Sequence, residues 1–133
     1  MQNLFGQSFT NRIINGAMVI DQRNAGASLT NVSSYIYSVD RFIFGGSQNS
    51  KYTIQQNAGS VTPPAGYTNY LGVTSLSSYT CLATDYFSIQ HRIEGYNVAD
   101  LAWGTANAKT VTLSFWVRSS LTGTFEEIGR AHV

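Results

Sequence analysis

Acidic residues and one histidine are the side chains in this sequence that could carry out acid–base chemistry. Hydrolysis of a glycosidic bond needs two carboxylates that face one cleft, and Asp40, Asp85, Glu94 and Asp100 meet that need only in being acids. Glu94 stands two residues after an arginine, whose charge favours the ionised carboxylate over a proton donor. His91 falls on the apolar side of a predicted strand, so we expect a core histidine and not a member of a catalytic triad. The sequence, which also has no G-x-S-x-G or phosphate-binding motif, therefore predicts a protein that is not an enzyme.

Metal-ligating residues are equally sparse. Cys81 is the single cysteine, so the chain has neither a CxxC pair for zinc nor an intrachain disulfide. We expect Cys81 to be a small buried thiol. Calcium needs about six to eight oxygen ligands, and the acids do not follow a D-x-D-x-D spacing. No metal site and no cofactor is predicted.

One arginine is expected to act structurally. A guanidinium forms planar, two-pronged hydrogen bonds to a carboxylate. We predict that Arg41 pairs with Glu94 or Asp100 and thereby pins a loop to a sheet. Direct contact of Arg41 with a ligand is the alternative.

Composition determines the fold class. Charged residues make up 11% of the 133 residues, whereas Ser, Thr and Asn together number 38 and aromatics reach 13%. Such a chain lacks the Lys and Glu that cover exposed helices and suits half-buried strands. The net charge of +1 includes no basic stripe, so binding of nucleic acid is not predicted. No apolar run approaches the roughly 20 residues of a membrane span, so membrane insertion is not predicted either.

Short runs of strand-forming residues alternate with turn residues along the whole chain. The regular spacing predicts an antiparallel β-sandwich or barrel. A short helical turn or a loop is expected over residues 97–103. Strands are expected at residues 17–22, 35–37, 40–44, 52–56, 70–74, 85–94, 109–119 and 121–125.

Two of these runs alternate clearly enough to assign their faces. In residues 85–94, Phe87 and Ile89 share the apolar face with His91, and the opposite face is mostly polar. In residues 109–119, four apolar side chains point one way and Thr112, Ser114, Trp116 and Arg118 point the other. Both segments are expected to be sheet members whose apolar faces meet in one interior, and the functional interpretation below depends on this.

Four motifs resemble one family in the expected order. They are N-R-I-I-N-G-A-M-V-I-D-Q-R-N-A-G at residues 11–26, Y-S-V-D-R-F at 37–42, S-I-Q-H-R-I-E at 88–94 and K-T-V-T-L-S-F-W-V-R-S-S at 109–120. This pattern is similar to the jelly-roll domains of tailed-phage virion proteins, which are tail-fibre or receptor-binding-like and resemble carbohydrate-binding modules. Phe42 stands where that family commonly has Trp, and His91 where Gln is common.

The resemblance implies an all-β, antiparallel jelly-roll β-sandwich located in the virion, in the phage tail. It implies partners among other virion and tail proteins, a homo-oligomer, and adhesion that involves host-surface glycans. A sugar site usually combines an aromatic face with planar polar groups. Trp116 and Arg118, with Gln90 and Arg92 on a neighbouring strand, would supply both, whereas packing of Trp116 under a loop is the structural alternative. A carbohydrate-binding module of a larger enzyme is the second functional candidate, and a small glycosidase or lyase is a remote third.

The final residues depart from the pattern before them. Residues 127–133, E-I-G-R-A-H-V, resemble the translation of a sequencing adapter. We therefore expect a jelly-roll domain over residues 1–126 that is C-terminally truncated near Phe125, followed by an artefactual tail over residues 127–133. A short natural tail is the alternative.

Overall fold

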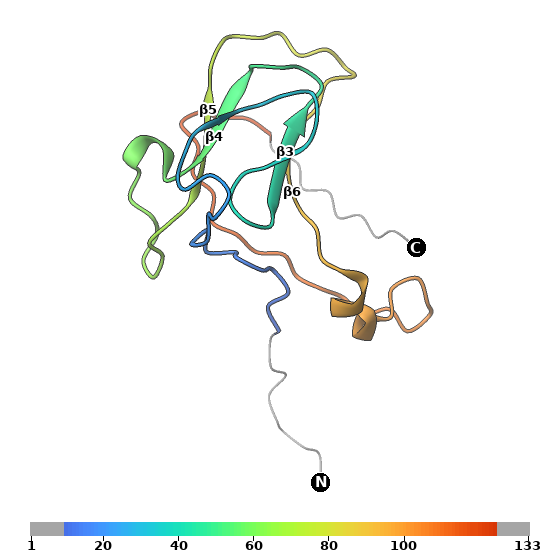
Figure 1. Cartoon of the computed structure of the whole chain (residues 1–133). Helices are drawn as coiled ribbons and strands as arrows, with labels where there is room; N and C mark the ends of the chain where they lie inside the picture. Colours follow the sequence, from blue (N-terminus) through green and yellow to red (C-terminus); the bar gives the residue numbers. More distant parts are fainter. Residues whose placement is uncertain (1–9, 125–133) are drawn as a thin grey trace. The chain divides into compact units, whose positions relative to one another are not determined.

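The computed structural model describes residues 10–124 and shows an all-β chain. Two three-stranded antiparallel sheets form most of its regular structure (Figure 1). One sheet has the order β1-β4-β5, with β1 at Leu29–Thr30, β4 at Tyr52–Gln56 and β5 at Leu71–Ser75. The other has the order β2-β3-β6, with β2 at Ile36–Tyr37, β3 at Phe42–Gly46 and β6 at Phe87–His91. The chain divides into two compact units, one up to Ile93 and one from Glu94 onward, and all six strands belong to the first.

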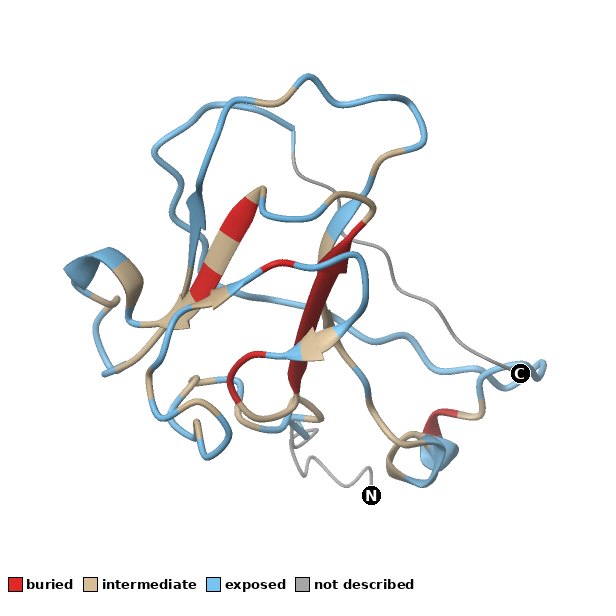
Figure 2. Cartoon of the chain, turned by 45° about the horizontal axis from the view of Figure 1, so that its top comes forward, coloured by how far each residue is buried: buried red, intermediate tan, exposed pale blue. Residues whose placement is uncertain are grey.

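Register decides which side chains of the sheet β2-β3-β6 face the core. Phe44 lies opposite Ile36 on one side and Ile89 on the other, so the three side chains share one face. Phe44 is fully buried and clusters with Tyr52 and Ile54 of β4, which places this face toward the other sheet. Figure 2 shows that β3 is buried along its length. Tyr37, Ile43 and Gln90 form the next row across the sheet and therefore face away from that core.

Tyr52 joins the two sheets through several contacts. Its ring centroid lies 5.9 Å from that of Phe44 and 6.0 Å from that of Phe87. Its hydroxyl donates a hydrogen bond of 3.1 Å to the carbonyl oxygen of Gly45 on β3. Burial of the hydroxyl raises the pKa of Tyr52. One side chain of the sheet β1-β4-β5 thus packs against, and hydrogen-bonds to, the opposite sheet.

Two polar side chains organise the loops beside this core. Asn31 is fully buried, and its side-chain oxygen accepts hydrogen bonds from the backbone N–H groups of Lys51 and Tyr52, at 2.6 and 3.0 Å. Its amide nitrogen donates to the carbonyl oxygen of Gln48 at 2.5 Å. Because every one of these groups is paired inside the protein, Asn31 fixes the turn between β3 and β4 without a desolvation penalty.

The carboxylate of Asp85 performs the corresponding role for the segment before β6. It accepts hydrogen bonds from the Ser47 hydroxyl at 2.6 Å, the Tyr79 hydroxyl at 2.7 Å and the Leu82 N–H at 2.9 Å. These donors, with Ser47 the strongest, hold the pKa of Asp85 well below its usual value. The hydrogen bond from the Tyr79 hydroxyl to this carboxylate raises the pKa of Tyr79 to about 12.

Most predicted strands of the first unit are confirmed with small shifts in their ends. The run at residues 52–56 coincides with β4, and the runs at 35–37, 40–44, 70–74 and 85–94 each contain most of a strand. His91 shares the face of Phe87 and Ile89, as predicted. The run at residues 17–22 is not a strand, because it is folded into turns in which Met18 has a φ of 56°. The expectation of a buried Cys81 is also wrong, since this thiol is exposed.

The strand predicted at residues 109–119 is wrong for the structure described. This segment has no strand assignment, and Phe115 and Trp116 are 66% and 75% exposed. An alternating segment becomes a strand only where a neighbour pairs with its backbone groups, and the described residues from 94 onward contain no other strand. Residues 121–124 are likewise not a strand, whereas the short helical turn expected near residues 97–103 is confirmed by η2 at Gly95–Asn97 and η3 at Ala99–Leu101. Phe125 and the segment 127–133 lie outside the described residues.

Side chains on the core faces of two outer strands, β5 and β6, remain half exposed. Ile89 on β6 is 46% exposed although it lies opposite the fully buried Phe44. Val73 on β5 lies opposite the fully buried Ile54 and is similarly exposed. Within the first unit the interior is therefore concentrated on β3 and β4. The jelly-roll topology expected from the sequence needs more strands than the six described. The two sheets therefore do not form a jelly roll by themselves.

Replacing Tyr52 with Phe tests the link between the sheets. The variant keeps the ring but leaves the Gly45 carbonyl oxygen without its donor, which costs about 1–2 kcal/mol in the free energy of unfolding. Urea denaturation of the variant and the wild type measures the difference. Tyr96→Phe is the control, because Tyr96 is 78% exposed and its substitution should leave stability unchanged. Equal stability of Tyr52→Phe and the wild type would contradict the proposed link.

Acidification should destabilise the protein through Asp85. The pKa of the native carboxylate is lower than that of the unfolded chain, so the unfolded state binds more protons as the pH falls below about 5, and the stability contributed by Asp85 is lost progressively from there toward about pH 2. Urea midpoints across this range measure the loss, and the ¹³C shift of the Asp85 carboxyl carbon follows its titration directly. Tyr79→Phe removes one donor and should raise the pKa of Asp85. A native carboxyl that titrates at its ordinary value would refute this account.

Candidate functional site

The outward side of the sheet β2-β3-β6 carries a group of tyrosine and polar side chains. We call it the tyrosine face and define it as Tyr35, Tyr37, Tyr86, Ser88 and Gln90. The three tyrosines are 43%, 44% and 46% exposed, although each belongs to or flanks a strand. The rings of Tyr35 and Tyr86 are stacked, with centroids 6.3 Å apart and an angle of 29° between their planes. Exposed aromatic rings beside hydrogen-bonding groups are the usual elements of a site for small polar ligands.

A glycine lets Tyr35 lie across the sheet. Gly45 occupies the outward position of β3 opposite Ser88. A β-carbon at Gly45 would lie 2.9 Å from both the Cδ1 atom of Tyr35 and the carbonyl oxygen of Ser34. The ring of Tyr35 therefore uses the space of the missing side chain, and this brings it within reach of Tyr86 and β6.

The polar groups of the tyrosine face lie close enough to affect one another. Interaction with the Tyr86 hydroxyl lowers the pKa of Tyr35, and the same interaction raises the pKa of Tyr86. Ser88, Gln90 and the charge of Arg92 lower the pKa of Tyr35 further, whereas burial opposes them. Gln90 donates to the Ser88 hydroxyl at 3.2 Å. Several donors and acceptors are thereby gathered on one exposed surface.

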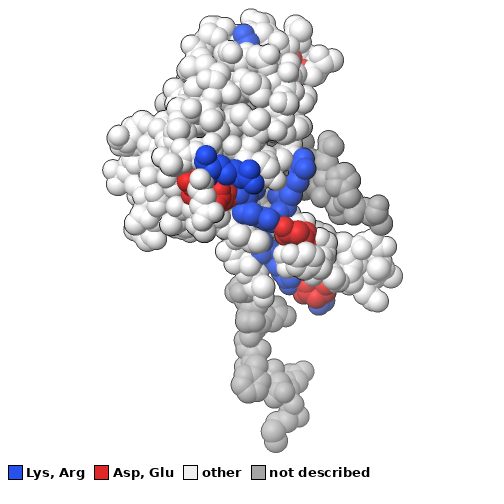
Figure 3. Space-filling model, viewed as in Figure 1, with Lys and Arg blue, Asp and Glu red and all other residues white. Residues whose placement is uncertain are grey.

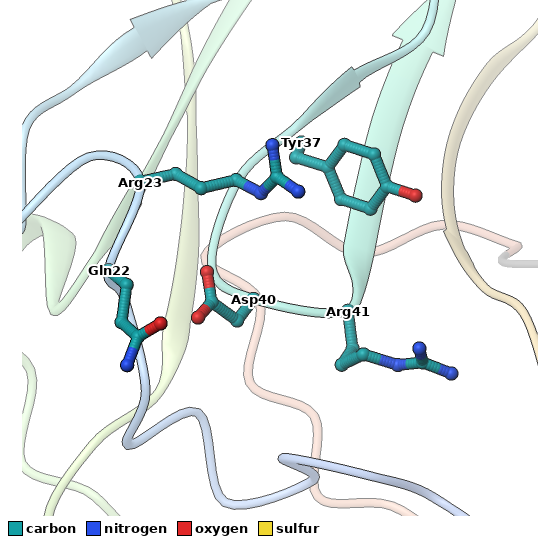
Figure 4. A pocket seen from close by; sticks show the side chains of 5 residues that line it. All are labelled: Gln22, Arg23, Tyr37, Asp40 and Arg41. Atoms are coloured by element: carbon teal, nitrogen blue, oxygen red, sulfur yellow. The ribbon is translucent and has the colours of Figure 1, made fainter.

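A shallow pocket of about 350 Å³ adjoins the tyrosine face at Tyr37. Its lining consists of Gln22, Arg23, Tyr37, Asp40 and Arg41 (Figure 4). The guanidinium carbon of Arg23 lies 4.5 Å from the centroid of the Tyr37 ring, a cation–π contact. Figure 4 shows the Asp40 carboxyl group between the side chains of Gln22 and Arg23, with the Arg41 side chain directed away from them. An aromatic ring, two cations, a carboxylate and an amide are thus combined in one concavity.

Amide side chains hold residues 11–26, the first family-like motif, against the strands. The Asn15 amide donates to the carbonyl oxygens of Ile20 and Asp40, both at 2.8 Å. Asn24 donates to the carbonyl oxygen of Ser38 at 2.5 Å, and Gln56 of β4 donates to that of Met18 at 2.6 Å. The motif therefore forms a loop that carries two residues of the pocket, Gln22 and Arg23, and is not a strand.

The turn between β2 and β3 positions the remaining pocket residues. Arg41 has a φ of 79°, in the left-handed region that favours glycine. Its guanidinium donates a hydrogen bond of 3.0 Å to the carbonyl oxygen of Arg92. A non-glycine residue held in this conformation is strained by about 1–2 kcal/mol, and the turn retains it with its side chain bonded to the segment after β6.

The structure brings together part of the site predicted from the sequence. Gln90 lies on the tyrosine face, and Arg92 follows β6 closely enough to affect Tyr35. Trp116 and Arg118 belong to the second compact unit, where both are exposed. The joint site of these four residues therefore stays a prediction. The pairing of Arg41 with Glu94 or Asp100 also stays a prediction, since both acids lie in that second unit, where Glu94 accepts a hydrogen bond from Asn97 at 3.2 Å.

Sequence reasoning missed two tyrosines at β2: Tyr35, which precedes the strand, and Tyr37, which lies in it. Tyr35 and Tyr37 are two residues apart and therefore share a face of a strand, which is a signal the sequence contains. The strand is only two residues long in the structure, too short for its pattern to stand out. Arg23 and Gln22 carry no such signal, because the loop that presents them is held by contacts distant in sequence.

Other candidate chemistry is limited in the described residues. His91 donates through Nε2 to the carbonyl oxygen of Ile14 at 3.0 Å and packs edge-on against Phe42. Residues 10–124 contain no cluster of His, Cys, Asp and Glu that could hold a metal ion, and no helix among them is long and apolar enough to cross a membrane. Charged side chains occupy a small part of the surface in Figure 3.

Comparisons with protein-family models, with curated proteins and with solved structures give no match to this chain.

Replacing Gly45 with Ala tests the packing of Tyr35. The added methyl group would meet the Ser34 carbonyl oxygen and the Tyr35 ring, so the free energy of unfolding should fall by about 1–3 kcal/mol and the near-ultraviolet circular dichroism of the tyrosines should change. Gly95→Ala is the matched control, because nothing lies within 4 Å of a β-carbon there. If the Gly45 variant has wild-type stability and spectrum, Tyr35 does not occupy this space.

Proposed function

We propose that this chain is a non-catalytic adhesion domain of a phage virion, associated with a tail fibre or receptor-binding protein, that binds host-surface glycans through the tyrosine face. The support from the sequence is the ordered set of four motifs similar to those of phage jelly-roll domains. The support from the structure is an all-β architecture in which one sheet exposes three tyrosines on its outward side. The interior that residues 85–94 and 109–119 were expected to share is not formed, because residues 109–119 are not a strand, so the proposal rests instead on the sheet β2-β3-β6. It extends the two sheets to a jelly-roll sandwich and includes other virion proteins and further copies of the chain as partners.

The observation that carries the glycan proposal is the stacked pair of Tyr35 and Tyr86 beside Gln90. The apolar face of a pyranose ring packs on an exposed aromatic ring, and its hydroxyl groups pair with planar polar side chains. Gly45 holds Tyr35 in place before a ligand arrives, so little conformational entropy is lost on binding. The two sequence-predicted residues Gln90 and Arg92 border this same surface.

Two of the described acids, Asp21 and Asp85, have structural roles, which favours binding over catalysis. Both oxygens of Asp21 accept backbone hydrogen bonds, from Asn24 and Gly26. Both oxygens of Asp85 are engaged by Ser47, Tyr79 and Leu82, and the pKa of this carboxyl is lowered. A general acid instead needs a pKa near the working pH, so Asp85 does not suit that role.

A glycan array probed with the full chain tests the proposal. The wild type should bind a subset of glycans. Tyr35→Ala and Tyr86→Ala should each reduce binding about tenfold or more, since the contact between the apolar face of the sugar and an aromatic ring is lost. Tyr96→Ala, which removes an exposed tyrosine in the second unit, should bind as the wild type does. Thermal denaturation checks that each variant is folded.

Trp116→Ala in the same experiment tests the site predicted from the sequence. A loss of binding would add Trp116 to the glycan site, and unchanged binding would remove it and leave the tyrosine face. If the wild type binds no glycan, the adhesion proposal is wrong. The genes beside this one supply the virion test: tail and capsid genes are expected there, whereas a catalytic domain in the same reading frame would favour a carbohydrate-binding module.

A further inference from the structure

The pocket beside the tyrosine face contains a cation with unused hydrogen-bond donors. Within the described residues, the Arg23 guanidinium makes no hydrogen bond or ion pair, and its contact is the ring of Tyr37, 4.5 Å away. A cation–π contact engages the face of the guanidinium and leaves its N–H groups, which lie in its plane, available to a ligand. Arg23 is exposed, so these donors are accessible from solvent.

A carboxylate stands beside this cation in a fixed position. The backbone of Asp40 is held on both sides, because its N–H donates to the carbonyl oxygen of Ile20 at 3.0 Å and its own carbonyl oxygen accepts from Asn15 at 2.8 Å. Its Oδ1 atom is buried and has no hydrogen-bond partner in the described structure. A carboxylate oxygen in that condition gains strongly from a donor, and Asp40 is one of the residues that line the pocket.

The loop that carries Arg23 is held in place as firmly as Asp40. Asp21 accepts hydrogen bonds from the N–H groups of Asn24 and Gly26, at 3.2 and 2.6 Å. Asn24 in turn donates to the carbonyl oxygen of Ser38, next to the turn that contains Asp40. The backbone segments that carry Arg23 and Asp40 are therefore both held by hydrogen bonds, and the amide of Gln22 lies on the far side of Asp40 (Figure 4).

We infer that this pocket is a subsite for a neutral pyranose, in which two neighbouring hydroxyl groups donate to Asp40 and accept from Arg23 while the sugar edge contacts Tyr37. The inference rests on the proposed glycan-binding function and names the class of sugar. A hydroxyl group both donates and accepts, so a vicinal diol satisfies a carboxylate and a guanidinium at once. A sugar acid held by Arg23 would bring its carboxylate next to Asp40, and an amino sugar held by Asp40 would bring its ammonium next to Arg23, so repulsion between like charges disfavours both.

Titration of the full chain with small sugars tests this inference. The probes are methyl α-mannoside, methyl β-galactoside and methyl β-glucoside, with glucuronic acid as the charged counterpart, and binding is followed by chemical shifts of backbone amides. At least one neutral glycoside should bind and shift the signals of Gln22, Arg23 and Asp40. Glucuronic acid should bind at least about tenfold more weakly.

Variants separate this pocket from the tyrosine face. Asp40→Asn and Arg23→Ala should each weaken binding of the neutral glycoside about tenfold or more, since each removes a charge-assisted hydrogen bond. Lys109→Ala, which removes an exposed cation in the second unit, should leave the affinity unchanged. Arg23→Ala lies outside the turn that contains Asp40, so it keeps the test valid if Asp40→Asn alters that turn.

Three results would overturn the inference. Tight binding of glucuronic acid would contradict a neutral ligand. Wild-type affinity in both pocket variants, together with loss of glycan-array binding in Tyr35→Ala, would exclude the pocket but retain the proposed function. Absence of binding by every glycoside here and by every glycan on the array would refute both.

Discussion

The contact of Tyr52 with the opposite sheet is the constraint on which the first unit depends. Each sheet has three short strands, and such sheets become stable when an apolar face is covered. Tyr52 supplies an aromatic ring between Phe44 and Phe87 and a hydroxyl that satisfies the Gly45 carbonyl oxygen. Burial of a ring and satisfaction of a backbone acceptor thus coincide in one side chain. Because Gly45 also makes room for Tyr35 on the other side of the sheet, the interior and the tyrosine face share a residue.

That shared residue explains how the proposed ligand surface is kept in order. The inward side chains of β3 contact the core. On the outward side of the sheet, Ile43 of β3 lies in a row between Tyr37 of β2 and Gln90 of β6. Ile43 is buried in the middle of this row, with polar or aromatic neighbours on both sides. The tyrosine face therefore lies on both sides of β3, the most buried of the described strands: Tyr37, Ser88 and Gln90 lie on the neighbouring strands, and Tyr35 and Tyr86 directly precede them. Side chains supported in this way are better suited to a preorganised site than those on irregular segments.

Periodicity in the sequence was sufficient to predict the fold class and most strands of the first unit. Residues 52–56 and 87–91 alternate between apolar and polar side chains and have partners within the chain, so pattern and structure agree. Residues 109–119 alternate even more clearly, yet side chains such as Trp116 are exposed, because a period of two specifies faces and does not supply a neighbouring strand. The same periodicity correctly predicted that Gln90 faces away from the core, whereas the sugar site of which it is part stays a prediction. The pocket was not predicted, because Arg23 and Asp40 meet only through the folding of the loop before β1.

The hydrogen bonds that hold residues 11–26 against the strands determine how this loop responds to salt. This loop is held by hydrogen bonds from side-chain amides to backbone carbonyl oxygens, donated by Asn15, Asn24, Gln55 and Gln56. Amide groups carry no net charge, and screening by dissolved ions acts on charges. The amide bonds that attach the loop to the strands should therefore respond less to the ionic strength of the medium than a set of lysine–glutamate pairs would.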